Sequence, residues 1–200
     1  MQFKAIVFTT ILLLGGCSST VKKQVETLKK TNVCCKEFSE LVYSSIKINN
    51  DTKVKIDKKS PAYQFESGKA YFKAFQLNKV KSRLNIEIKS LFNGAFSIVG
   101  QDHSNDFIKP HIILLDEQYN VVAKLDSEAK YVDSTFTENA HFLLNYESKS
   151  KLVKYLIFTT DANNLSYSDA NLKESGSYGV SYHLTKIDHA PTGKFTLKVQ

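Results

Sequence analysis

Hydrophobic and polar residues alternate along most of the chain after position 50, a pattern typical of β-strands with one face in water. Leu84, Ile86 and Ile88 are separated by polar residues, and Phe195, Leu197 and Val199 repeat the pattern. A more continuous apolar run at 110–116 predicts another strand, and the run at 152–160, the most strand-like in the chain, predicts a strand central in its sheet. Together these runs predict a mainly β domain over residues 51–200, an antiparallel, jelly-roll-like β-sandwich.

Turn residues divide the remaining strands. The sequence 66–68 is Glu-Ser-Gly between two apolar runs and predicts a hairpin that joins strands at 63–65 and 70–77. The stretch 161–179 is rich in Asn, Ser and Asp and predicts a long loop. Further short strands are expected at 54–57, 96–99, 121–125 and 140–146.

The segment before the alternating region has a different period. Cys35, Phe38, Leu41 and Val42 recur at helical spacing, so we expect a short helical segment within residues 31–50. Residues 17–30 are polar and rich in lysine. They are compatible with a helix that has Val21, Val25 and Leu28 on one side, but we interpret them mainly as a tether.

Residues 1–16 have the composition of a signal peptide. Lys4 is followed by an apolar run from Ala5 to Leu14 and then by two glycines. The run is shorter than the roughly 20 residues that a permanent membrane span needs. We therefore expect an exported chain that begins at Cys17.

Leu14-Gly15-Gly16-Cys17 resembles a bacterial lipobox. The resemblance implies that Cys17 is lipidated and holds the chain at a membrane, since several acyl chains together make a stable anchor. Ser18 follows the cysteine, and by the same resemblance this favours the outer membrane. The expected location is the periplasmic space, with the chain anchored to the outer membrane.

Cys34 and Cys35 are the other two cysteines. Neighbouring Cα atoms lie about 3.8 Å apart, closer than in most disulfides. The pair is compatible with a redox-sensitive disulfide, with two free thiols or with a link to another chain. No second ligand pair accompanies it, so zinc is not expected.

Composition excludes some partners. The net charge of +7 is spread along the chain, and no basic run with interleaved aromatic residues indicates a nucleic-acid surface. A weak attraction to anionic headgroups or to an acidic partner is compatible with this charge. A hydrophobic content of 42% is ordinary for a folded domain.

No motif predicts catalysis, a metal or another cofactor. The stretch 102–106 contains two aspartates and His103, and we interpret it as a solvated turn. The stretch 161–172 lacks the glycine and the final glutamate of a calcium loop. The sequence 175–179 lacks the order of a nucleophile elbow. The other histidines are isolated along the chain and are interpreted as structural: His111, His141, His183 and His189.

A sugar site would need aromatic faces, and the chain has no tryptophan. Core or sheet packing explains each tyrosine equally well. The tyrosines considered for such a site are Tyr63, Tyr71, Tyr119, Tyr131, Tyr167, Tyr178 and Tyr182.

One further set of segments consists of the cysteine pair 34–35 before Phe38 and the stretches 60–65, 68–77, 110–116, 155–160 and 190–194. Together these segments resemble the maltose-operon periplasmic protein (MalM-like) family. The resemblance implies a non-catalytic periplasmic protein associated with maltose and maltodextrin uptake. The lipobox departs from the family's soluble enterobacterial namesake.

Three functions follow as hypotheses. The first is a non-catalytic envelope lipoprotein with an accessory or binding role in maltose and maltodextrin transport. The second is a structural or assembly lipoprotein of the outer membrane that binds another envelope protein and no sugar. The third is an envelope hydrolase, for which no set of nucleophile, base and orienting residue is recognisable.

Overall fold

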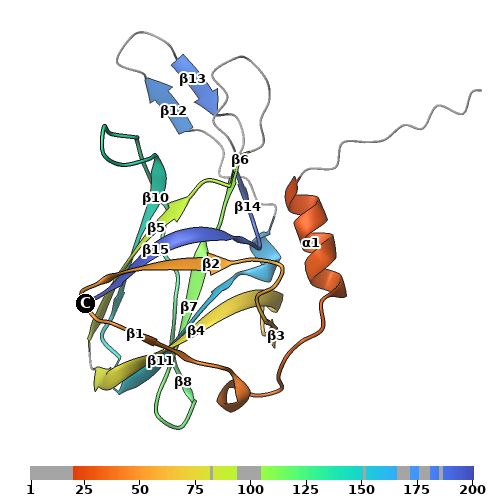
Figure 1. Ribbon diagram of the computed structural model, residues 1–200, viewed down its shortest axis with the longest axis vertical. Helices are drawn as coiled ribbons and strands as arrows, with labels where there is room; N and C mark the ends of the chain where they lie inside the picture. The colour runs from red at the N-terminus through yellow and green to blue at the C-terminus, as the bar shows by residue number, and fades with distance from the viewer. Residues whose placement is uncertain are drawn as a thin grey trace, which may run out of the picture.

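The computed structural model describes residues 20–81, 83–93, 105–150, 152–165, 172–175, 181–184 and 187–200. Their fold is a β-sandwich of two main sheets preceded by one short helix, α1 (Thr20–Lys30) (Figure 1). This confirms the mainly β prediction. The signal segment and Cys17 lie outside the described residues.

The first sheet has the order β1-β4-β11-β7-β8, and β3 pairs with β4 beside this path. The second sheet has the order β2-β15-β5-β10-β9. The pairs are antiparallel except that β1 runs parallel to β4 and β14 runs parallel to β6. The bounds are β1 (Ser44–Ile46), β2 (Asp51–Ile56), β3 (Ala62–Phe65), β4 (Gly68–Lys81), β5 (Leu84–Leu91), β6 (Asn105–Phe107), β7 (Pro110–Leu115), β8 (Val121–Leu125), β9 (Lys130–Val132), β10 (His141–Ser148), β11 (Val153–Thr160), β12 (Leu172–Ser175), β13 (Ser181–Leu184), β14 (Ile187–His189) and β15 (Gly193–Val199), with 3-10 turns η1 (Phe38–Glu40) and η2 (Ala162–Asn164).

The alternating strands bury one face between the sheets. Ile86 and Ile88 of β5 and Leu197 of β15 are buried in the central core, as their spacing predicts. β11 is buried on both faces: Leu156 belongs to this core, and Ile157 to a second apolar cluster. That double burial explains why its sequence is continuously apolar, and its place between β4 and β7 confirms that it is central.

The hairpin of β3 and β4 is also confirmed. Phe65 pairs with Gly68 across a tight turn, and Gly68 has a φ of 114°, which favours glycine. A Cβ atom at this position would lie 2.9 Å from the Cβ of Ala162. The predicted strand at 96–99 lies outside the described residues, whereas the predicted loop at 161–179 contains η2 and β12.

Residues 31–50 form no α-helix, contrary to the prediction. They contain the 3-10 turn η1 and the strand β1, and Val33 forms a bridge with Ala62. Backbone pairing with β3 and β4 replaces the local helix. Two of the residues with helical spacing still pack on the sheet, because Phe38 stacks on Tyr63 at 5.2 Å between ring centroids and Leu41 is buried, whereas Val42 is exposed.

Residues 20–30 are not a free tether. They form α1, and both Val21 and Leu28 are buried against the domain, with exposed fractions of 1% and 2%. The two side chains lie seven positions apart and therefore on one side of the helix. The apolar stripe formed by Val21 and Leu28 is narrow, and lysines surround it. The polar composition of the segment therefore favoured a tether. α1 and the end of β15 lie on opposite sides of the sandwich (Figure 1).

Candidate functional site

A groove of about 460 Å³ lies beside α1. It lies between the helix and the turn that joins β2 to β3, and the residue just before β15 also lines it. We call it the α1 groove. Its lining residues are Lys23, Gln24, Thr27, Lys55, Asp57, Lys58, Lys59, Tyr71 and Thr192.

Polar contacts fix the C-terminal end of α1. Lys69 Nζ donates to the carbonyl oxygens of Lys29 at 2.7 Å and Thr31 at 2.9 Å. A cation at this end satisfies carbonyls that have no partner within the helix and opposes the helix dipole. The hydroxyls of Thr31 and Tyr71 lie 2.9 Å apart and share a further hydrogen bond. The helix wall of the α1 groove is therefore attached to β4.

A second contact fixes the middle of the helix. The Thr192 hydroxyl donates to Gln24 Oε1 at 2.7 Å, which links α1 to the residue just before β15. Among the described residues, the amide nitrogen of Gln24 has no hydrogen-bond partner. Amide and hydroxyl groups of this kind are able to hydrogen-bond a polyhydroxylated ligand.

The opposite wall is a turn held by its own side chains. The Asp57 backbone N–H donates to Ser60 Oγ at 3.0 Å, and the Lys59 N–H donates to Asp57 Oδ1 at 2.9 Å. Lys55 Nζ lies 2.9 Å from Asp57 Oδ2. The hydrogen bond from Lys55, followed by that from Lys59, lowers the pKa of Asp57 below its ordinary value, so the carboxylate is charged at neutral pH.

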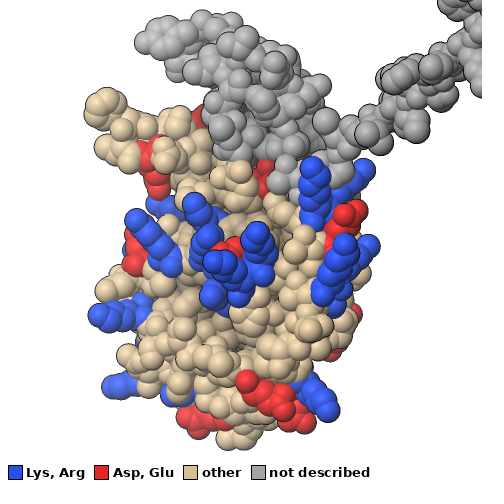
Figure 2. Space-filling model, turned by 45° about the vertical axis from the view of Figure 1, so that its right-hand side comes forward, with Lys and Arg blue, Asp and Glu red and all other residues tan. Residues whose placement is uncertain are grey.

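The α1 groove is basic, since four lysines and one aspartate line it. Asp57 is already paired with Lys55. Within the described part of the chain, no carboxylate lies within ion-pair distance of Lys23, Lys58 or Lys59. Lysine and arginine side chains gather on the face shown in Figure 2, which carries α1. This combination favours a ligand with both negative charge and hydrogen-bonding groups.

A smaller pocket lies beside β14. It has a volume of about 30 Å³ and is lined by Lys109, His111, Asp126, Thr160, Asp161, Leu165, His189 and Ala190. We call it the β14 pocket. His111 and His189 are isolated along the sequence, but the fold brings both to this pocket together with two carboxylates and a threonine.

The β14 pocket does not have the arrangement of a hydrolase. Thr160 Oγ1 is buried and forms no hydrogen bond with any described residue, so neither His111 nor His189 is placed to activate it. Burial lowers the pKa of His111, which keeps its imidazole neutral at pH 7. The volume holds about two water molecules and is too small for a sugar. We interpret it as a hydrated polar pocket.

The stretch 102–106 differs from the predicted solvated turn at its last residues. Asp106 lies in β6, is 3% exposed, and accepts a hydrogen bond from Asn93 Nδ2 at 2.6 Å. It pairs in register with the buried Asp188 of β14. Burial raises the pKa of Asp106. Because turn residues surround Asp106 in the sequence, no local pattern predicted that β6 pairs with a strand 82 positions away. Residues 102–104 lie outside the described residues.

The structure joins Cys34 and Cys35 in a disulfide, one of the three alternatives that the sequence left open. The backbone N–H of Cys34 donates to the Ala62 carbonyl at 2.8 Å, which fixes the segment on β3.

Among the described residues, no three His, Cys, Asp or Glu side chains lie close enough to hold a metal ion.

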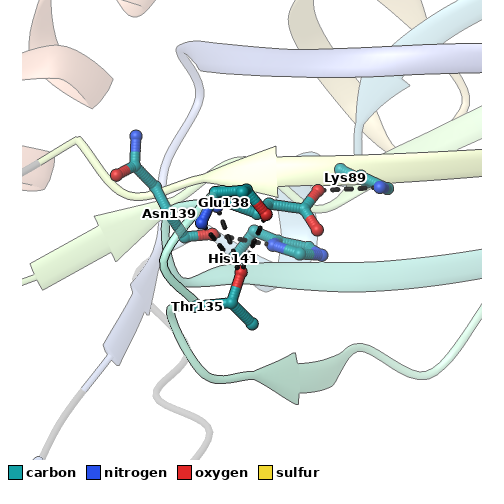
Figure 3. Close-up of polar contacts among 6 residues, drawn as sticks. Lys89, Thr135, Glu138, Asn139 and His141 are labelled. Carbon is teal, nitrogen blue, oxygen red and sulfur yellow. Dashed lines mark hydrogen bonds and ion pairs between the residues drawn. The ribbon is translucent and has the colours of Figure 1, made fainter.

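His141 lies among contacts that hold the turn before β10 in place. Its Nδ1 lies 2.9 Å from the Asn139 carbonyl oxygen, and Lys89 Nζ lies 2.7 Å from Glu138 Oε1 (Figure 3). The Thr135 hydroxyl accepts a hydrogen bond from the Glu138 backbone N–H. These contacts attach the turn before β10 to β5. The residues in these contacts do not form a pair of nucleophile and base.

The remaining candidate site residues either have structural roles or lie outside the described residues. Asp161 caps η2 by accepting a hydrogen bond from the Asn163 N–H. Tyr119 stacks on Tyr155 at 4.7 Å, and Tyr131 packs edge-on against Phe92. Tyr63 and Tyr71 are buried. His183 and Tyr182 lie in β13, while Tyr167, Tyr178 and residues 176–179 lie outside the described residues.

Comparisons of the chain with protein-family models, with curated proteins and with solved structures gave no match. None of the helices in the described ranges has the length and apolar content needed to cross a bilayer. The structure defines a β-sandwich protein with a basic groove beside the helix α1.

Proposed function

We propose that this chain is a non-catalytic envelope lipoprotein with an accessory or binding role in maltose and maltodextrin transport. It is anchored to the outer membrane through lipidated Cys17 and lies in the periplasmic space. The observation that carries the binding role is the α1 groove, whose volume of about 460 Å³ falls within the range of small-molecule sites.

Two features of the groove support carbohydrate as a ligand. Gln24, Thr27 and Thr192 offer amide and hydroxyl groups, the chemistry that hydrogen-bonds sugar hydroxyls. The resemblance to the MalM-like family supports maltodextrin as the type of sugar. The lysines around the groove add positive charge that a neutral sugar does not use. They therefore support an additional contact with a negatively charged group.

Isothermal titration of the lipidated protein in detergent with maltodextrins tests direct binding. We expect saturable heat at millimolar or lower sugar, and a Thr27→Val variant with at least a several-fold weaker affinity. A Lys47→Ala variant is the matched control, because Lys47 is exposed and precedes Asn49, which bonds the far end of β15. An absence of heat from every maltodextrin would exclude direct sugar binding.

The alternative proposal is an assembly lipoprotein that binds another envelope protein and no sugar. Val42 and Phe136 support it, since both are largely exposed apolar side chains. Scattered exposed residues of this kind are common, so they carry less weight than the groove. Crosslinking in intact cells would capture one dominant protein partner if this alternative were correct.

A further inference from the structure

The position of the α1 groove relative to Cys17 restricts where the groove works. α1 begins at Thr20, three residues after Cys17, so their Cα atoms lie at most about 11 Å apart. Lys23 follows three residues further along the helix, which adds about 4.5 Å. A lipid on Cys17 therefore keeps Lys23 within about 16 Å of the anchor, measured between Cα atoms. Without the long tether that the sequence suggested, the groove stays next to the bilayer.

The other groove lysines share this position. Lys58 and Lys59 lie across the groove from Lys23, and all three lack an acidic partner among the described residues. Lysines near an anionic bilayer strengthen binding by roughly fivefold each, and the effect extends over about a Debye length of 8 Å in physiological salt. Lys23 lies within about two Debye lengths of the anchor, and Lys58 and Lys59 lie across the same groove, so headgroup charge acts on all three when the α1 side of the domain faces the bilayer.

We infer that the α1 groove binds the phosphate-bearing headgroups of anionic membrane lipids and so orients the domain on the bilayer. Lys23, Lys58 and Lys59 contact the phosphate. The amide nitrogen of Gln24 donates to a polyol such as the glycerol of phosphatidylglycerol, and the Thr27 hydroxyl, which itself donates to the Lys23 carbonyl at 2.9 Å, accepts from it. The inference rests on the lipid anchor of the proposed function and not on maltodextrin binding.

The test uses the intact lipoprotein reconstituted on two kinds of vesicle, phosphatidylcholine alone and phosphatidylcholine with phosphatidylglycerol. An amine-acetylating reagent is added, and mass spectrometry gives the acetylation rate of each lysine. We expect the rates at Lys23, Lys58 and Lys59 to fall at least about fivefold on the anionic vesicles. The protection should disappear at about 0.5 M salt, where screening is stronger.

Lys47 and Lys149 are internal controls at the far end of the sandwich. Lys47 precedes Asn49, whose N–H bonds the Val199 carbonyl, and Lys149 follows Ser148, which pairs with Leu84 near the Gln200 backbone. Thr192 of the groove lies before the opposite end of β15, roughly 23 Å away at strand spacing. A K58E/K59E variant should lose the protection at Lys23, and a K47E/K149E variant should keep it.

The outcomes separate the two proposals. Equal labelling of the groove lysines on both vesicles, with the protein still attached, overturns the headgroup assignment and leaves the lipoprotein intact. Protection on neutral vesicles by added inorganic phosphate, equal to that on anionic vesicles, assigns the site to a soluble anion and also overturns it. Failure of the wild-type protein to float with neutral vesicles removes the lipid anchor, and both proposals then fall.

Discussion

Gln24 and Thr192 lie 168 positions apart in the sequence, and their side chains meet in a 2.7 Å hydrogen bond. The bond joins α1 to the start of β15 and closes one side of the α1 groove. A segment with the composition of a linker is thereby part of the folded domain. The groove exists only because the helix is held in this place.

Removal of this bond should loosen the helix. We expect Gln24→Ala and Thr192→Val each to lower the free energy of unfolding by about 1 kcal/mol, the usual net contribution of a hydrogen bond. The double variant should cost less than the sum, since both changes remove the same interaction. Urea denaturation of the four proteins measures this. Strict additivity of the two effects would contradict a direct bond.

Leu28 provides a stronger test that α1 belongs to the domain. Its side chain is 2% exposed, and truncation of a buried leucine to alanine costs about 2–5 kcal/mol. The exposed Glu26 is the matched control on the same helix, and Glu26→Ala should change stability by less than about 0.5 kcal/mol. If residues 20–30 were a free tether, L28A would denature at the same urea concentration as the wild-type protein.

Much of the sandwich was predictable because the burial of each strand determines its pattern of hydrophobic and polar residues. Ile86 and Leu197 alternate with polar residues and lie in the core, and the continuous apolar run of β11 indicates burial on both faces. Residues 31–50 were predicted as helical because Cys35, Phe38 and Leu41 have helical spacing. The same spacing also fits an irregular segment that packs on a sheet.

The candidate site was not predictable in the same way. Lys23, Lys58 and Thr192 come from three distant segments, and no local pattern records that they share a groove. His111 and His189 likewise meet only through the fold. The weak apolar stripe of Val21 and Leu28 was the one sequence signal for the position of α1, and lysines surround it.

The disulfide of Cys34 and Cys35 should contribute little to stability. The two residues are neighbours, and chain-entropy arguments give about 1 kcal/mol for so short a loop. In a protein of this size that corresponds to a change in Tm of about 2–4 °C. Thermal unfolding with and without reductant checks this, and a C34S/C35S variant controls for other effects of the reductant. A fall of more than about 10 °C would show that the bond supports the fold.

Asp106 should make stability depend on pH. Burial raises the pKa of its carboxyl in the folded state, so the folded protein binds this proton more tightly than the unfolded chain does. The contribution of Asp106 to the free energy of unfolding is fully present below about pH 3.9, the pKa of an aspartate in the unfolded chain. That contribution is lost as pH rises through the pKa of Asp106 in the folded protein. Asp106→Asn, which keeps an acceptor for Asn93, should therefore gain stability relative to wild type as pH rises from 4 to 7.

Asp116 is the control with the opposite sign. Hydrogen bonds, first from the Asn120 side chain, lower its pKa, so its contribution is present at neutral pH and is lost in acid. Asp116→Asn should lose stability relative to wild type as pH rises from about 2 to about 4, and the difference should then stay nearly constant up to pH 7. Urea denaturation at several pH values compares the two variants. Parallel curves for D106N and wild type would mean that Asp106 does not titrate between pH 4 and pH 7.

Membrane attachment through Cys17 is the central claim, and fractionation of cells that produce the full chain with Cys17→Ser tests it most directly. The wild-type protein should be found in the outer-membrane fraction. The variant should leave that fraction, because headgroup contacts at the α1 groove are weak without acyl chains. Retention of C17S in the outer membrane at the wild-type level would contradict the lipoprotein account.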